Sequence, residues 1–414
     1  MSSAAASSAA LTDSDGTGGV TPLDELRARM AQIMGRADGK PTQKTNGENT
    51  LPFVRVECEG GPLWQRRMAM ERSHHVGRVP VAPGADARGE ILSLLALDGA
   101  LASVDFSDAL YFDTETTGLG GAGVVAFLVG LGSYDDAGCF ELEQLLLRSP
   151  GEERALLVRL RDAMNAASVW ISFNGKSFDW PLIRGRYVMQ RMKPPEQRPQ
   201  LDLLHVSRRL HKARIGRCNL KSVESEILGF DRVGDIEGAD VAACYTQFLR
   251  TGNDEPLRAV VDHNLWDVVS MGALVGLYAE PLERLHDGDL LGLAQTLRRA
   301  GALGRAQMAA TVALTRGGGG EALRVRGQIA KARGDRAAAL ADFESSSRQI
   351  DDPSVRLELC KLYEHYVKQP DKALALMDAG TGEDALALQK RRDRLRRKSE
   401  QQKNPGPVLR RTRG

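Results

Sequence analysis

The chain has 414 residues, and its 56 Lys and Arg against 54 Asp and Glu leave a net charge of +2. That length suits two folded units plus tails, because domains usually span roughly 100–200 residues. The near-neutral balance identifies no partner by itself, so the distribution of charge along the chain matters more. The cysteines lie far apart, with no C-x-x-C pair and no zinc-finger spacing, which excludes a zinc finger and predicts free thiols in a reducing compartment.

The sequence shows the pattern of neither a membrane span nor a secretory signal. No stretch reaches the ~18 consecutive apolar residues that a membrane span requires, and the run Val124–Leu131 is better explained as a buried strand. Residues 1–20 lack the basic start and apolar centre of a secretory signal. We therefore expect a cytoplasmic protein with no membrane partner.

The N-terminal part divides in two. Residues 1–50 are poor in large apolar side chains, so we expect disorder there, except for a short amphipathic helix over Leu23–Ile33. Residues 51–105 alternate short apolar runs with Gly and Pro and form an N-terminal extension of the next domain. The pair His74 and His75 lacks neighbouring metal-ligand residues, so we interpret it as structural.

Residues 106–282 carry the pattern of an α/β domain. Three apolar runs separated by Gly-rich turns, Ala109–Asp113, Val124–Tyr134 and Cys139–Leu147, predict a meander of strands. Strands at Ser168–Phe173 and Leu201–Leu204 then alternate with helices, which predicts a mixed sheet flanked by helices. The expected helices are Glu152–Ala166, Phe178–Arg191 and Pro256–Tyr278.

Residues 290–389 predict an all-α helical-repeat domain. Similar turn-then-helix segments begin at Gly301, Gly334 and Gln369, at a spacing of roughly 34 residues, the length of a tetratricopeptide repeat. Ordinary helical hairpins are the alternative. Such repeats form concave surfaces, so a protein partner could bind there.

The segment 390–414 is a basic tail, with seven Lys or Arg among the nine residues Lys390–Lys398. Such runs are usually solvated helix faces or unstructured tails. Contact with nucleic-acid phosphates is the alternative.

The first motif with chemical content is Asp113-Thr114-Glu115-Thr116 at the end of an apolar strand. Residues i and i+2 of a strand share a face, so the two carboxylates would project together and repel unless a cation neutralises them. A hard divalent ion suits such oxygen ligands. Thr116 and the glycine that follows would let the backbone approach a phosphate, although a D-x-E pair on a strand is also often structural.

The second motif runs from Asn174 to Asp179, where a strand enters an Asn-Gly turn and a helix follows. Asp179 caps that helix, supplies a ligand, or does both. Asn174 and Phe178 offer a polar group and an aromatic platform of the kind used on unpaired nucleotides.

The third motif places His263 and Asp267 four residues apart, and hence on one face of a helix. A single helical histidine is more often a surface or core residue than a catalyst. Here it accompanies the acid that completes a set of four carboxylates.

Together these motifs resemble the DEDD 3′–5′ exonuclease superfamily. The Asn-Gly-x-x-Phe-Asp element is similar to the second exonuclease motif of family B DNA polymerases. The whole pattern, over roughly residues 50–400, most resembles the YprB-like ribonuclease H-like proteins, whose nuclease core is followed by helical repeats. The resemblance implies a ribonuclease H-like fold.

The resemblance also implies a two-metal site and a function. Asp113, Glu115 and Asp267 would hold one Mg²⁺ or Mn²⁺, and Asp113 with Asp179 the second. The implied activity is 3′–5′ exonucleolytic hydrolysis of single-stranded DNA or RNA. The alternatives are a nucleic-acid-binding or scaffold protein with a weak or inactive nuclease site, and an endonuclease of the ribonuclease H type.

His263 departs from the superfamily pattern, which places Tyr four residues before the last Asp or His five residues before it. This chain has His at the four-residue position and Asp262 at the five-residue position. Because the pKa of histidine lies near neutrality, His263 could still orient or deprotonate the attacking water. We therefore predict Asp113, Glu115, Asp179, His263 and Asp267 as the catalytic set.

Overall fold

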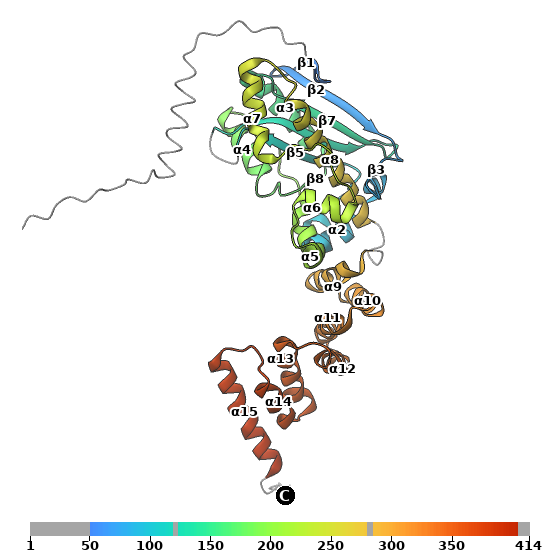
Figure 1. Cartoon of the computed structure of the whole chain (residues 1–414), viewed down its shortest axis with the longest axis vertical. Coiled ribbons are helices and arrows are strands. Elements are labelled where there is room, and N and C mark those ends of the chain that lie inside the picture. The colour runs from blue at the N-terminus through green and yellow to red at the C-terminus, as the bar shows by residue number, and fades with distance from the viewer. Residues whose placement is uncertain (1–49, 119–122, 280–284, 405–414) are drawn as a thin grey trace, which may run out of the picture. The chain divides into compact units, whose positions relative to one another are not determined.

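The computed structural model describes residues 50–118, 123–279 and 285–404, so the helix expected at Leu23–Ile33 lies outside the described residues. A seven-stranded sheet has the order β1-β2-β7-β6-β5-β8-β9 (Figure 1). The strands are β1 Val54–Cys58, β2 Gly61–Met70, β5 Ala109–Thr116, β6 Ala126–Tyr134, β7 Phe140–Leu146, β8 Val169–Ser172 and β9 Gln200–Asp202. β5 runs antiparallel to β6 and parallel to β8, which confirms the predicted mixed sheet.

The expected meander is formed by β5, β6 and β7, which pair in sequence order. The extension adds to the same sheet, because the β1–β2 hairpin pairs with β7 through β2. The strands β3 His75–Val76 and β4 Val79–Pro80 form a separate two-stranded ladder. The strand expected over Leu201–Leu204 is shorter, because Asp202 accepts a hydrogen bond from Leu204 and starts a helix there.

Helices cover both faces of the sheet (Figure 1). Ala109 and Tyr111 of β5 face a core shared with α2, α5 and α8. Leu110 and Phe112 face the other core, shared with α3, α4 and α7. These helices are α2 Gly89–Ala96, α3 Glu153–Ala166, α4 Asp179–Met189, α5 Leu203–Ile215, α7 Gly238–Thr251 and α8 Leu257–Ala279. Because side chains alternate along a strand, the residues that continue β5 also divide between the two faces.

Helix α8 packs closely on the centre of the sheet. Gly130 and Gly132 of β6 lie under it, and a Cβ added at Gly130 would come within 2.5 Å of Asn264 Oδ1 and 2.7 Å of Val268 Cγ2. A Cβ at Gly132 would lie 2.8 Å from Val268 Cγ1. The missing side chains therefore let the helix that carries the third motif approach the strands that carry the first.

An all-helical region follows the sheet, as predicted. Its helices are α9 Asp287–Arg299, α10 Leu303–Thr315, α11 Gly319–Ala332, α12 Arg336–Ser347, α13 Pro353–Leu362, α14 Pro370–Asp378 and α15 Ala385–Lys403. α9 packs on α10, α11 on α12 and α13 on α14. The repeated segments at Gly301, Gly334 and Gln369 each precede the second helix of such a pair.

The basic run Lys390–Lys398 lies inside α15, so residues 390–403 extend the helical region. Arg394 and Lys398 pair with the buried Glu364, and Arg391 also lies within ion-pair distance of it. Within the three described segments, no helix combines the length and the apolarity needed to cross a bilayer.

Candidate active site

The strand β5 supplies the first two carboxylates. Asp113 and Glu115 continue the face of Ala109 and Tyr111, and so they point toward α8. A bulge between Glu115 and Thr116 shifts the register with β6 and ends the regular pairing there. Both carboxylates are therefore held on a rigid central strand at the point where its ladder ends.

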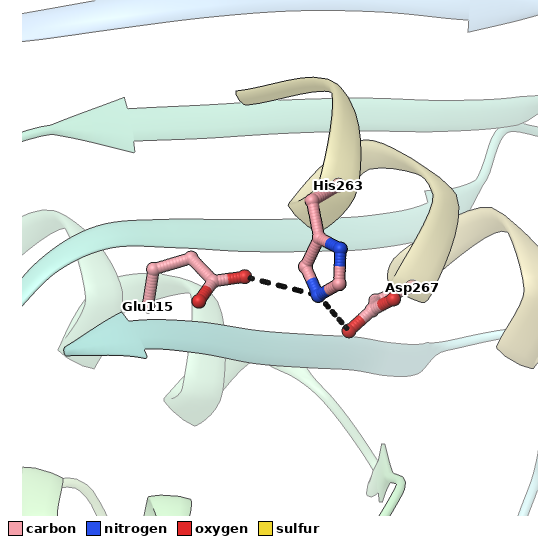
Figure 2. Close-up of side chains that lie close together, drawn as sticks. All are labelled: Glu115, His263 and Asp267. Atoms are coloured by element: carbon pink, nitrogen blue, oxygen red, sulfur yellow. Dashed lines mark ion pairs between the residues drawn. The ribbon is translucent and has the colours of Figure 1, made fainter. Parts of the chain in front are cut away.

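Helix α8 supplies the facing residues. His263 Nε2 lies 4.0 Å from Glu115 Oε1 and 3.7 Å from Asp267 Oδ2, with both α8 side chains pointing toward the strand (Figure 2). One ligand atom from each of the three residues lies within 4.8 Å of the other two. A carboxylate from the sheet and one from the helix thus meet around the imidazole.

Asp113 is half-buried and is fixed by amides. Asn264 Nδ2 donates to Asp113 Oδ2 at 3.0 Å, and Gln144 Nε2 donates to Asn264 Oδ1 at 3.0 Å. Gln144 also donates to the backbone oxygen of Val261 at 2.8 Å, which ties β7 to α8. Asp113 therefore has one defined orientation, set by a chain of buried hydrogen bonds.

Asp179 is the first residue of α4, at the end of β8 where the second motif predicted it. It accepts a hydrogen bond from the Thr114 hydroxyl, so the residue between Asp113 and Glu115 ties this acid to β5. The preceding turn is fixed by Asp202, whose carboxylate accepts from the backbone N of Asn174 at 2.9 Å and of Lys176 at 3.2 Å. Asp202 thus has a structural role at this turn.

A loop before α7 adds two charged residues that sequence reasoning missed. Asp235 Oδ1 lies 2.6 Å from His263 Nδ1, so the ring presents Nε2 to the acids. Arg232 binds Asp267 Oδ1 and lies 2.6 Å from Glu224 Oε1. Both loop side chains are 4% exposed. No helical or strand period marks this segment, so the sequence gives no signal for these two residues.

The carboxylates disfavour one another's charge. Burial and the acids Asp267, Asp179 and Glu115 hold the pKa of Asp113 well above its usual range. Burial and the Asp267 carboxylate raise the pKa of Glu115 to about 8. Burial raises the pKa of Asp179 to about 6, although the Thr114 hydrogen bond opposes the shift. Such a set of buried oxygen donors fits a divalent cation, which would stabilise the ionised forms.

Burial and the neighbouring acids shift the pKa of His263 in opposite directions. Burial on its own lowers the pKa of His263, but Asp267, Glu115 and the hydrogen bond to Asp235 together raise it. Asp267 keeps Oδ2 on the side of His263 while Arg232 binds Oδ1. The guanidinium therefore fixes Asp267 without covering the oxygen that faces the other acids.

The three residues predicted to bind substrate lie at the borders of this cluster. Thr116 Oγ1 donates to the backbone oxygen of Gly118 at 2.7 Å and stabilises the turn after β5. Asn174 is exposed and has a φ of 71°, a left-handed conformation that asparagine tolerates. Phe178 is half-buried and precedes Asp179. Of the predicted catalytic set, Glu115, His263 and Asp267 lie within ligand distance of one another. Asp113 and Asp179 lie close enough for their charges to act on the same acids.

Comparison with protein families indicates the class of the sheet domain. Residues 110–278 match the model of the RNase_H superfamily, and this range contains all three acidic motifs. The chain is also similar to the uncharacterized protein YprB of Bacillus subtilis (strain 168), with 38% identity over 176 residues, 42% of this chain and 41% of that protein. The matched segment thus spans about two fifths of the relative's length.

A solved structure is also similar. The family B DNA polymerase from the hyperthermophilic archaeon Pyrobaculum calidifontis matches with 17% sequence identity and a TM-score of 0.34. That match covers 54% of this chain and 29% of the polymerase chain.

Proposed function

We propose that this protein is a divalent-metal-dependent nuclease that removes nucleotides from the 3′ end of single-stranded DNA or RNA. The observation that carries the proposal is that Glu115 of β5 meets His263 and Asp267 of α8 within ligand distance. Asp113 and Asp179 lie beside this group, and their charges act within the same set of acids. The similarity of residues 110–278 to the RNase_H superfamily supports the same class of chemistry.

Asp113, Glu115, Asp179 and Asp267 would hold two Mg²⁺ or Mn²⁺ ions. Bound there, the ions would neutralise the acids and stabilise the charge that develops on a phosphodiester during hydrolysis. The protein groups would fix the geometry in advance. Asn264 orients Asp113, the Thr114 hydroxyl orients Asp179, and Arg232 orients Asp267.

His263 is proposed to orient the attacking water and accept its proton. In the neutral ring, donation from Nδ1 to Asp235 leaves the lone pair on Nε2, the atom that faces Glu115 and Asp267. The hard oxygen donors favour Mg²⁺ or Mn²⁺, whereas an imidazole ligand would favour softer ions such as Zn²⁺. We therefore assign the imidazole a proton-transfer role rather than a ligand role.

The proposal is tested with purified protein and matched DNA and RNA oligonucleotides labelled at the 3′ or the 5′ end. We expect degradation that requires Mg²⁺ or Mn²⁺, with mononucleotides released first from the 3′ end. Asp113→Asn, purified identically, should be inactive. Equal hydrolysis by the two preparations would indicate a contaminant, and internal fragments would indicate an endonuclease of the ribonuclease H type.

One observation favours a second candidate function. Arg232 and His263 already supply cationic partners to Asp267, so the chain neutralises part of the acid cluster itself. These cations would be enough to neutralise Asp267 in a nucleic-acid-binding or scaffold protein that has an inactive nuclease site and partner-binding helical repeats. Oligonucleotide binding without hydrolysis under any divalent metal would favour that candidate.

A further inference from the structure

The sequence places many cations near the second motif, and the structure divides them. Most have partners within the chain. Arg186 pairs with Glu153 and Arg214 with Asp289. Lys176 lies 3.5 Å from Asp98, and Arg209 Nη1 donates to the backbone oxygen of Leu95 at 3.2 Å. These residues are accounted for by packing and stability.

A second group has no such partners. Arg208, Lys212 and Arg217 are exposed, and no carboxylate of the described segments forms an ion pair with any of them. All three line one surface hollow of about 660 Å³, together with Asn174, Phe173 and Asn219. No acidic side chain lines this hollow, which we call the basic hollow.

Without a bound ligand, the neighbouring positive charges of the basic hollow lower the stability of the fold. Arg208 and Lys212 lie one turn apart on α5, and like charges at that spacing destabilise a helix. The negative end of the helix dipole accounts for Lys212 in the last turn. It does not account for Arg208 in the middle of α5 or for Arg217, which follows the helix. An anionic ligand would account for all three.

The basic hollow is connected to the candidate active site by one rigid turn. Asn174 forms part of its wall, and its backbone oxygen accepts from Ser177 and Phe178, the residues directly before Asp179. The Asp202 carboxylate anchors the same turn at Asn174 and Lys176. A second hollow of about 630 Å³ shares Gly216, Arg217 and Asn219 with the first and reaches Arg232, whose guanidinium contacts Asp267.

We infer that the basic hollow binds the phosphate backbone of a single nucleic-acid strand, with phosphates on Arg208, Lys212 and Arg217, next to the linkage that reaches the acids. The inference rests on the proposed function for its substrate class. Cationic side chains that each contact one phosphate bind a strand through its backbone and do not recognise its bases. The hollow therefore sets affinity and leaves sequence preference weak.

The test is binding of a fluorescent single-stranded oligonucleotide by the full chain, measured by anisotropy in EDTA so that hydrolysis plays no part. Combined Arg208→Ala, Lys212→Ala and Arg217→Ala should weaken binding about tenfold or more. The slope of log affinity against log salt should fall by about 2, since each lost contact to a single strand accounts for about 0.7. Thermal melting checks that the variant is folded.

The matched control is Arg154→Ala, which removes an exposed cation of α3 on the opposite core of the sheet. It should bind as the wild type does. Unchanged affinity and slope in the triple variant would overturn the inference even if the wild type degrades the oligonucleotide. Loss of binding in the triple variant alone, with a wild type that hydrolyses nothing, would support the hollow and refute the proposed nuclease.

Discussion

Two buried acid clusters in this chain behave in opposite ways. In the helical region, burial alone would raise the pKa of Glu364, but hydrogen bonds from Arg394 and Lys398 lower it to about 2. In the sheet domain, burial and Asp267 raise the pKa of Glu115 to about 8. Cations of the chain neutralise Glu364. Around Glu115, in contrast, the acidic side chains outnumber the cationic ones. Burial of an acid is therefore structural in one region and indicates an external cation in the other.

The largest contrast is expected in hydrolysis. Asp113→Asn keeps the shape of the side chain but removes a proposed cation ligand, so hydrolysis of a labelled oligonucleotide should fall about 1,000-fold. Glu364→Gln should leave the rate unchanged at temperatures well below its melting point, although the loss of its charged hydrogen bonds costs about 1–3 kcal/mol of stability, since Arg394 and Lys398 are partly exposed. If both variants lost activity equally, the two clusters would not differ as described.

Removing the imidazole should have the next largest effect. His263→Ala eliminates the proposed proton acceptor, so kcat should fall by about 100-fold, at the lower end of general-base contributions. Single-turnover kinetics with saturating Mn²⁺ separate this loss from weaker metal binding. A decrease of less than a few fold would remove His263 from the catalytic set.

A smaller effect is expected for the residue that orients the imidazole. Asp235→Asn keeps a hydrogen-bond acceptor at His263 Nδ1 but removes a charge that raises the pKa of His263. Activity should fall about tenfold. Because the ring must be neutral to accept a proton, the acidic limb of the kcat/KM profile should move to lower pH. A tenfold loss with an unmoved profile would make Asp235 a purely structural residue.

The smallest effect concerns stability without metal. Since the folded pKa of Glu115 is about 8 and its ordinary value is 4.5, the folded state binds more protons between about pH 5 and 8. Stability must therefore fall as pH rises through that window. Glu115→Gln should flatten the decline in EDTA and melt a few degrees higher than the wild type at pH 8. Parallel melting curves for the two proteins across this pH range would contradict the raised pKa.

The sequence predicted the strands of the meander and the long helix α8 because their apolar periods are long and bounded by turn residues. It also predicted which acids share a face, since Asp113 and Glu115 follow from the two-residue period and His263 and Asp267 from the helical one. The sequence could not predict which residues of irregular segments contact the side chains of the site. Arg232 and Asp235 lie on a loop without a period, and their contacts with α8 exist only after folding.

The basic run of α15 also has contacts that the sequence pattern could not predict. Its charge suggested a solvated face or a nucleic-acid contact, because runs of like charge usually have one of these roles. Glu364, which pairs with Arg394 and Lys398, lies 30 residues before Arg394 in a neighbouring element. Long-range ion pairs of this kind have no sequence period, so the pattern alone could not separate paired cations from available ones.

Calorimetric titration of Mn²⁺ into the metal-free protein near pH 7 tests the central claim most directly, because raised pKa values couple metal binding to proton release. The wild type should bind Mn²⁺, and the observed heat should depend on the ionisation enthalpy of the buffer. Asp113→Asn should lose that binding, while Glu364→Gln should retain it. Absence of binding by the wild type, or equal binding by Asp113→Asn, would contradict a cation site built from these acids.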